Sequence, residues 1–244
     1  MMKKDYNIDP FLGKRIANYD KWLNKGQISS SSKIIPVSES LTAKQWVLPT
    51  EQVMEILSNA DSIAVQNCEC RTHYKRCDKP LEVCLLLNKV GEKFVSKNQA
   101  RHVSLNEATD ILQMANENGL IHLALYMPDH EIFALCSCCF CCCHELQIVK
   151  LTERKELMVH SEYIATTDIA TCIHCGECVE RCIFDARIFN NEKMEYNPQA
   201  CLGCGLCVTV CPVEATAMTL RESKSRKEQN DSLDCRGLSR FEKS

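Results

Sequence analysis

Cysteine dominates the chemistry available to this 244-residue chain, which contains 19 of them. Eighteen fall into four tight groups, at positions 68–84, 136–143, 172–182 and 201–211, and Cys235 stands alone near the C-terminus. Lys3 and Lys4 are not followed by the apolar run of a signal peptide, so we expect a cytoplasmic protein in a reducing compartment. Dense cysteine in such a compartment indicates metal binding rather than a disulfide framework.

The third and fourth groups are two copies of one pattern, Cys-x-x-Cys-x-x-Cys-x-x-x-Cys, and Gly176 and Ala186 of the first copy match Gly205 and Ala215 of the second. Three cysteines in a tight loop can bind three corners of an iron-sulfur cubane, while the fourth points at the other cluster. Thiolates are soft anionic donors that suit such clusters. The eight cysteines concerned are Cys172, Cys175, Cys178, Cys182, Cys201, Cys204, Cys207 and Cys211.

This repeat resembles bacterial-type two-cluster ferredoxins over residues 163–220. The resemblance implies that Cys172, Cys175 and Cys178 with Cys211 hold one [4Fe-4S] cluster, and Cys201, Cys204 and Cys207 with Cys182 the other. Ile183 departs from the family pattern, which has proline after the fourth cysteine, as Pro212 does in the second copy. Gly176, Gly203 and Gly205 fit a close approach of backbone to inorganic sulfur. Two zinc sites are the alternative that Cys-x-x-Cys pairs would also permit.

The upstream groups supply ten more candidate metal ligands: Cys68, Cys70, Cys77, Cys84, Cys136, Cys138, Cys139, Cys141, Cys142 and Cys143. Together with the repeat they resemble a set of 4Fe-4S-binding proteins of anaerobes, which carry Cys-x-Cys-Arg, Cys-Asp-x-Pro-x-x-x-Cys and Cys-x-Cys-Cys-x-Cys-Cys-Cys ahead of a two-cluster ferredoxin domain. That resemblance implies an architecture without a reaction.

Some of these ten thiols must bind metal or be redox active, because six cysteines in eight residues cannot all be ordinary core residues. A subset could hold a third iron-sulfur cluster, with zinc as the main rival metal. A third interpretation is that some of these thiols form a redox relay through transient disulfides. Arg71, His73, Lys75 and Arg76 would place positive charge beside this site, unless they form a solvated basic loop. His144 follows Cys143 and is more often a neighbour of a ligand than a ligand itself.

Helix and strand signals around the cysteines predict an α+β fold. Asp9 can cap a helix that begins at Pro10, and its apolar face is expected to pack on the chain itself rather than on a partner or membrane surface. Thr50 can cap a second helix, and Ser104 with Glu107 forms a capping box for a third. Strands are expected at 62–65 and 120–126, each leading toward a cysteine group.

The domain boundaries that follow are an N-terminal helix and linker over 1–44, a Cys-rich α+β domain with a probable extra metal site over 45–150, the two-cluster ferredoxin-type domain over 163–220, and a mobile polar tail over 221–244. Both upstream cysteine groups are expected at one end of their domain.

Composition and motifs limit the classes of function that we expect for this chain. The chain has 29 Lys plus Arg against 32 Asp plus Glu, a net charge of −3 that gives no reason to expect nucleic acid, and no apolar run long enough to span a membrane. It has no Gly-rich dinucleotide fingerprint and no phosphate-binding loop. We therefore expect an electron-transfer protein that relays single electrons between a redox partner protein and its clusters. The alternatives are an iron-sulfur oxidoreductase whose upstream site acts on substrate, and a redox sensor.

Overall fold

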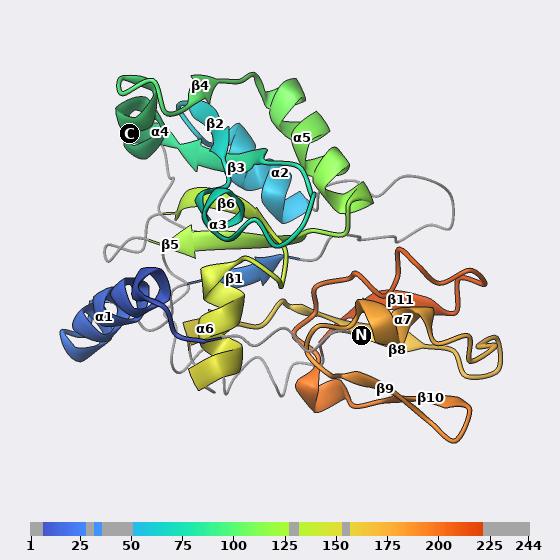
Figure 1. Cartoon of the computed structure of the whole chain (residues 1–244). Helices are drawn as coiled ribbons and strands as arrows, with labels where there is room; N and C mark the ends of the chain where they lie inside the picture. Colours follow the sequence, from blue (N-terminus) through green and yellow to red (C-terminus); the bar gives the residue numbers. More distant parts are fainter. Residues whose placement is uncertain (1–6, 28–31, 36–50, 127–131, 153–156, 222–244) are drawn as a thin grey trace.

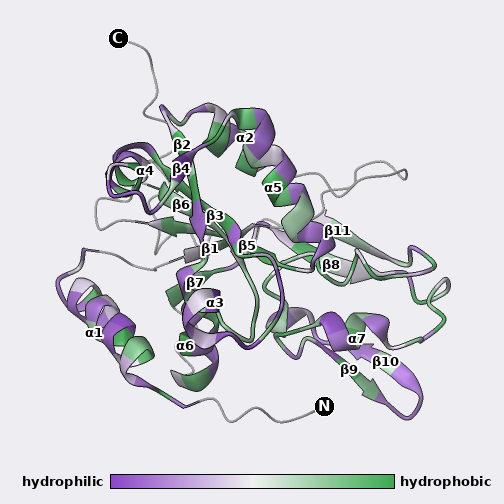
Figure 2. Ribbon diagram, turned by 45° about the horizontal axis from the view of Figure 1, so that its top comes forward, coloured by the Kyte–Doolittle hydropathy of each residue, from purple (hydrophilic) through white to green (hydrophobic). Residues whose placement is uncertain are grey.

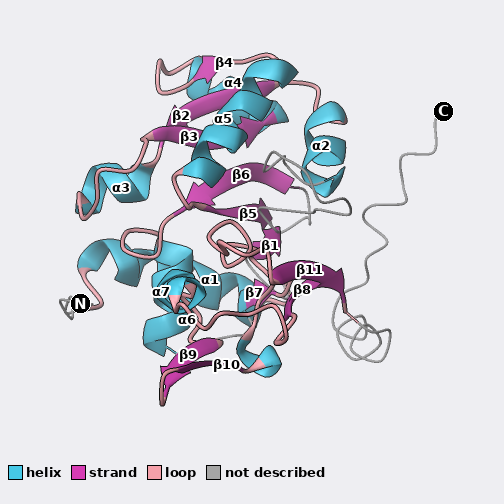
Figure 3. Ribbon diagram, turned by 90° about the vertical axis from the view of Figure 1, so that its right-hand side faces the viewer, coloured by secondary structure: helices cyan, strands magenta, loops and turns pink. Residues whose placement is uncertain are grey.

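The computed structural model describes residues 7–27, 32–35, 51–126, 132–152 and 157–221. They form a larger unit built on a seven-stranded sheet and a smaller unit with two two-stranded sheets, and Figures 1 and 3 both place the smaller unit below β1 of the large sheet. This mixture of helices and strands confirms the predicted α+β class. Thr50 and residues 222–244, with Cys235, lie outside the described residues.

The larger unit has the strand order β4-β2-β3-β6-β5-β1-β7. Its strands are β1 (Ser32–Ile35), β2 (Ile63–Asn67), β3 (Glu82–Leu87), β4 (Arg101–His102), β5 (Ile121–Tyr126), β6 (Ile132–Cys138) and β7 (Met158–Val159). Its helices are α1 (Pro10–Asn24), α2 (Glu51–Ser58), α3 (Glu69–Tyr74), α4 (Asn88–Val95), α5 (Leu105–Glu117) and α6 (His144–Thr152). All strand pairs are antiparallel except β1 with β7.

The predicted capping groups explain where two helices begin. Asp9 accepts a hydrogen bond from the backbone N–H of Leu12 at 2.9 Å, ahead of Pro10 in the first turn of α1. Ser104 accepts from the N–H of Glu107 at 3.2 Å at the start of α5. Figure 2 shows both hydrophilic and hydrophobic residues along α1, α2 and α5, as expected of helices with one buried face.

The large sheet is buried on both faces, which is why β3 reads as an apolar run rather than as an alternation. One face of β3, with Leu85 and Leu87, packs in a core with α2 and α5. Leu86 points to the other face, in a core that includes Leu146 of α6 and Leu206 of the smaller unit. The sheet therefore has α2 and α5 on one side, and α4, α6 and part of the smaller unit on the other.

Two segments that the sequence assigned to connections belong to this sheet. Residues 32–35, inside the expected linker, form β1 between β5 and β7. β7 lies in the interval between the two predicted domains. The apolar face of α1 packs on α6, where Leu12 and Tyr19 share a core with Ile148 and Leu157. The N-terminal segment is thus integrated into the larger unit.

The smaller unit contains β8 (Tyr163–Thr167) paired with β11 (Thr216–Leu220), β9 (Arg187–Asn190) paired with β10 (Lys193–Tyr196), the short helix α7 (Glu177–Arg181), and a 3-10 turn at Pro198–Ala200. Both pairs are antiparallel, so the chain enters on β8 and returns beside it on β11. Within the described residues, no helix has the length and apolar character needed to cross a membrane.

The smaller unit is tightly packed at Gly203, beside the segment that leads into β8. This residue has φ of +79°, and a Cβ built on it would lie 2.1 Å from the carbonyl oxygen of Tyr163 and 2.7 Å from the Cβ of Ser161. Ser161 in turn donates its N–H to the carbonyl of Leu202 at 3.0 Å. The close approach at Gly203 is therefore to protein backbone, which differs from the expected approach to inorganic sulfur.

Candidate metal centres

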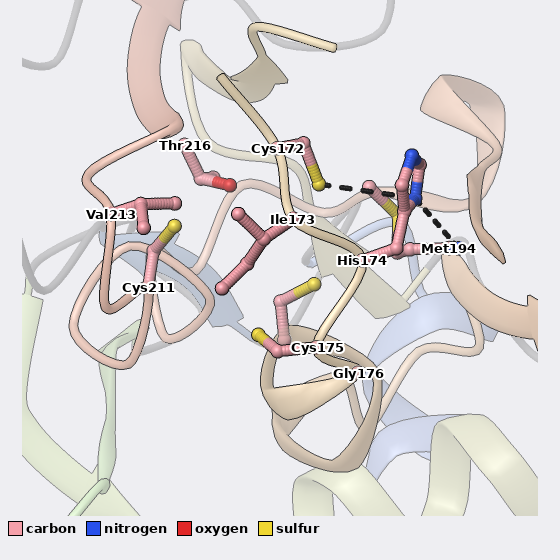
Figure 4. Close-up of a pocket in the computed structure, with 10 residues that line it drawn as sticks. Cys172, Ile173, His174, Cys175, Gly176, Met194, Cys211, Val213 and Thr216 are labelled. Carbon is pink, nitrogen blue, oxygen red and sulfur yellow. Dashed lines mark hydrogen bonds between the residues drawn. The ribbon is translucent and has the colours of Figure 1, made fainter. Parts of the chain in front are cut away.

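Four cysteines surround a first cavity in the smaller unit, shown in Figure 4. Cys172, Cys175, Cys178 and Cys211 line about 300 Å³ of space, together with Ile173, His174, Gly176, Met194, Val213 and Thr216. The loop before α7 supplies Cys172 and Cys175, the first turn of α7 supplies Cys178, and Cys211 comes from the turn before β11. The backbone N–H of Ala215 donates to Cys211 Sγ at 3.2 Å. Four thiols around an otherwise largely apolar space fit a thiolate-bound cubane.

A second cavity of about 320 Å³ is lined by the other four cysteines of the repeat, Cys182, Cys201, Cys204 and Cys207. Burial raises the pKa of Cys207 to about 11 and also raises that of Cys204. Buried thiols resist ionisation, so an iron ion that binds them as thiolates displaces protons. Cys211 lines the first cavity and Cys182 the second, a placement compatible with the exchanged fourth ligands that the ferredoxin resemblance implies.

Arg187 lines the second cavity and contacts Cys178 of the first, and no motif in the sequence marks it. Its side chain is buried, with Nη1 at 3.8 Å from Cys178 Sγ and 2.9 Å from the hydroxyl of Thr167. Burial disfavours the charge, but the charges of Cys207 and Cys178 outweigh burial and raise the pKa of Arg187. Its Nη2 has no hydrogen-bonding partner. A cation held between two thiol sets would stabilise anionic clusters at both.

His174 is fixed by the backbone rather than aimed at a metal. Its Nδ1 accepts a hydrogen bond from the N–H of Met194 at 3.1 Å and lies 4.0 Å from Cys172 Sγ, as the dashed lines in Figure 4 mark. With Nδ1 engaged, the ring lies beside a candidate ligand instead of acting as one.

In the larger unit the ten upstream cysteines separate into two sets. The six-thiol set comprises Cys68, Cys70, Cys84, Cys136, Cys138 and Cys143, and the four-thiol set comprises Cys77, Cys139, Cys141 and Cys142. The sheet assembles the first of these, because Cys84 of β3 and Cys136 of β6 are directly opposite partners. Cys138 lies two residues further along β6, on the same face.

Contacts between thiols run through the whole six-thiol set. Contact with Cys70 and then with Cys84 lowers the pKa of Cys68 to about 2, while contact with Cys68 raises the pKa of Cys70. Contact with Cys138 lowers the pKa of Cys136, and contact with Cys136 raises that of Cys138. Neighbouring thiols share protons in this way when several are buried together. Such a set is poised to exchange its protons for a metal centre.

In the four-thiol set all four sulfur atoms lie within 4.8 Å of one another. Cys77 Sγ is 3.7 Å from Cys139 Sγ, and Cys142 Sγ is 3.9 Å from Cys141 Sγ. Cys139 and Cys142 are buried, and Cys77 and Cys141 are half-buried. Adjacent residues Cys138 and Cys139 thus belong to different sets.

Arg71 is a buried cation in the cysteine-rich region of the larger unit, with 1% of its surface exposed. Its Nη2 donates to the carbonyl of Ser137 at 3.1 Å, and its Nε and Nη1 have no hydrogen-bonding partner. Burial opposes its charge, but Cys68 of one set and Cys139 of the other raise its pKa. The basic cluster foreseen from the sequence therefore includes one residue that faces both thiol sets.

The helix α1 covers the six-thiol set from outside. His144 Nδ1 lies 3.0 Å from Cys70 Sγ, and His144 Nε2 lies 3.0 Å from the hydroxyl of Tyr19. Tyr19 donates to the carboxylate of Glu145. Phe11 stacks on His73 with ring centroids 4.3 Å apart. This chain of polar groups connects the metal region to an element that the sequence treated as separate.

The second cavity and the six-thiol set meet in one hydrophobic core. Cys138 and Cys143 lie in that core with Leu206 of the smaller unit, and Cys204 packs against it. Ile183 also packs there, so the residue that replaces the family's proline contributes to the contact between units.

Comparisons with known proteins agree with the iron-sulfur chemistry that the cysteines of the smaller unit indicate. A family model described as a 4Fe-4S dicluster domain matches residues 165–218. An archaeal-type glutamate synthase [NADPH] of Dehalococcoides mccartyi is 29% identical over 72 residues, which are 29% of this chain and 14% of that protein. Hydrogenase-4 component A of Escherichia coli is 26% identical over 82 residues, 33% of this chain and 40% of that protein. The chain thus matches less than half the length of either relative.

The family match and the two cysteine-lined cavities both concern the smaller unit, and they lead to the same conclusion. The chain is an iron-sulfur protein that contains a 4Fe-4S dicluster domain.

Proposed function

We propose that the protein is an electron carrier that relays single electrons through two [4Fe-4S] clusters in the smaller unit to a third iron-sulfur cluster in the six-thiol set. The observation that carries the proposal is the shared core, in which Cys204 of the second cavity packs against Cys138 and Cys143. A packed, largely apolar contact between two thiol sites is suited to electron transfer over a short distance. The clusters would supply the one-electron chemistry.

The chain's own residues would hold and tune these centres. Cys172, Cys175, Cys178 and Cys211 would bind the first cluster, and the four cysteines of the second cavity would bind the second. Arg187 would stabilise the reduced, more negative form of both. Four thiolates on each cubane leave no open position for a substrate, which favours a carrier over a catalyst in this unit.

Electrons would enter or leave at the first cavity, because it is the more exposed of the two. Cys175 is exposed, and Ile173 beside it has 60% of its surface exposed. Phe189, 51% exposed, lies against Gly176 of the same loop. An exposed apolar rim at a cluster edge is what a redox partner protein would cover. One relative of the chain is named as a component of a hydrogenase, which is consistent with such a partner.

A test of this function uses anaerobically purified protein reduced with dithionite. Electron paramagnetic resonance should show [4Fe-4S]⁺ signals broadened by interaction between neighbouring clusters. An iron-replete sample without such interacting signals would overturn the proposal.

A second candidate is an iron-sulfur oxidoreductase whose six-thiol set acts on a substrate. The contact of His144 with Cys70 and with Tyr19 favours it, because a hydrogen-bonded chain could deliver protons to a reducible site. Reduced protein would then be reoxidised by a small disulfide or another candidate substrate, and the Tyr19→Phe variant would slow that reaction. Reoxidation at the same rate in both proteins would argue against this candidate.

A further inference from the structure

We infer that the four-thiol set, Cys77, Cys139, Cys141 and Cys142, binds one zinc ion, separate from every iron-sulfur cluster. This goes beyond the proposed function, which needs only the smaller unit and the six-thiol set.

The first argument is the spacing of the sulfur atoms. Zinc bound by four thiolates has Zn–S distances of about 2.3 Å, and a tetrahedron of that size has S···S edges of about 3.8 Å. Cys77 and Cys139 are 3.7 Å apart, Cys141 and Cys142 are 3.9 Å apart, and all four sulfur atoms lie within 4.8 Å of one another. A cubane instead places four iron atoms between its thiolates, which holds them further apart. Among the described residues, the cysteines of the smaller unit form no group of three or more whose sulfur atoms lie this close together.

The second argument is the charge beside the set. Four thiolates around a divalent ion leave a net negative charge, which needs a counter-charge where it is buried. Arg71 is that cation, because it contacts Cys139 and is fully buried with two nitrogens lacking a hydrogen-bonding partner. In a core without an anionic centre those nitrogens would carry a large desolvation cost.

The third argument is that the loop carrying three of the thiols is held in shape by other residues. The N–H of Cys142 donates to the carbonyl of Cys139 at 3.3 Å, which folds the loop back on itself. Arg76 donates to the carbonyl of Cys141 at 3.1 Å, and Gln147 donates to that of Cys142 at 2.9 Å. Hydrogen bonds that orient ligand residues are a regular feature of metal sites. The fourth ligand, Cys77, follows Arg76 directly, so the same arginine ties both ligand segments together.

Zinc is the metal that fits best. A closed set of four cysteines is a common structural zinc site, and divalent zinc binds such ligands more tightly than ferrous iron does. With no position left for substrate, the ion would join the loop after α3 to the turn after β6. It would thereby fix two of the segments that carry the six-thiol set.

The experiment measures metal in the full chain, purified anaerobically and dialysed against EDTA to remove loosely bound ions. We expect about one zinc per chain, with an X-ray absorption fine structure of four sulfur neighbours at about 2.3 Å. Zinc well below one per chain, zinc with nitrogen or oxygen neighbours, or iron bound at this set would each overturn the inference.

Two variants locate the ion. Cys77→Ser changes a half-buried ligand, and we expect it to lower the zinc content at least about fivefold while the iron of the smaller unit remains. The matched control is Cys175→Ser, which should lower iron and leave zinc unchanged. Equal zinc in wild type and Cys77→Ser would overturn the inference. The iron content and paramagnetic signals of the same samples report separately on the electron carrier.

Discussion

Replacing Arg187 with methionine tests whether this buried cation sets the reduction potentials of the dicluster domain. The Arg187 guanidinium lies 3.6 Å from the sulfur of Met194 and stacks on the ring of Tyr196. Methionine at this position keeps a long unbranched side chain but removes the charge. Without the cation, the more negative reduced clusters lose stabilisation, so both potentials should fall.

The size of the effect follows from distance. Arg187 Nη1 lies 3.8 Å from Cys178 Sγ, and a metal on that sulfur would lie roughly 2.3 Å further, about 6 Å from the charge. At an effective dielectric constant of about 20, a unit charge at about 6 Å contributes roughly 3 kcal/mol. Since about 1.4 kcal/mol corresponds to about 59 mV for one electron, the expected fall is on the order of 100 mV.

The assay is an anaerobic redox titration followed by electron paramagnetic resonance. Arg187→Lys should keep most of the wild-type potential because the charge remains. Lys193→Met on β10 is the control, since this lysine is exposed and water screens its charge. If both clusters are present in Arg187→Met and their potentials stay within about 20 mV of wild type, the electrostatic reasoning is wrong.

Three further substitutions test the packing at Gly203 in the smaller unit, a buried histidine of the large sheet, and the attachment of α1 to α6. Gly203→Ala should lower the free energy of unfolding by roughly 3 kcal/mol or more, measured by chemical denaturation, because its Cβ would overlap the carbonyl of Tyr163; an unchanged value would contradict the close approach. Burial lowers the pKa of His122 to about 4, below the value of about 6.5 that a histidine has in the unfolded chain. As the pH drops below about 6.5, the unfolded chain therefore takes up a proton before the folded chain does, and the free energy of unfolding falls. Between pH 7.5 and 5.5, His122→Gln should lose about 1 kcal/mol less than wild type, and equal losses would contradict this. Tyr19→Phe removes the donor to Glu145 and should cost about 1–3 kcal/mol; a cost near zero would show that this bond does not hold α1 on α6.

Local signals in the sequence were enough to predict much of the fold. Asp9 with Pro10, and Ser104 with Glu107, mark helix starts through hydrogen bonds that involve only neighbouring residues. The order of the seven strands was beyond such reasoning. β1 and β7 are short segments whose strand character depends on pairing with residues far away in the sequence.

The cysteine repeat could be recognised from the sequence because its ligands come from short loops with fixed spacing. The division of the upstream cysteines could not, because it depends on tertiary structure. Cys84 and Cys136 meet only through the pairing of β3 with β6, and Cys77 reaches Cys139 across 62 positions. Arg187 gave no signal either, since its role comes from its position between two cavities and not from a motif.

The relay into the larger unit is tested most directly by counting iron and acid-labile sulfide per chain in anaerobically purified protein. Three [4Fe-4S] clusters would give about twelve iron and about twelve sulfide per chain. The Cys84→Ser variant, which lacks one thiol of the six-thiol set, should lose the iron and sulfide of the third cluster. About eight of each in fully loaded protein, unchanged by Cys84→Ser, would contradict a cluster in the six-thiol set and leave the electrons confined to the smaller unit.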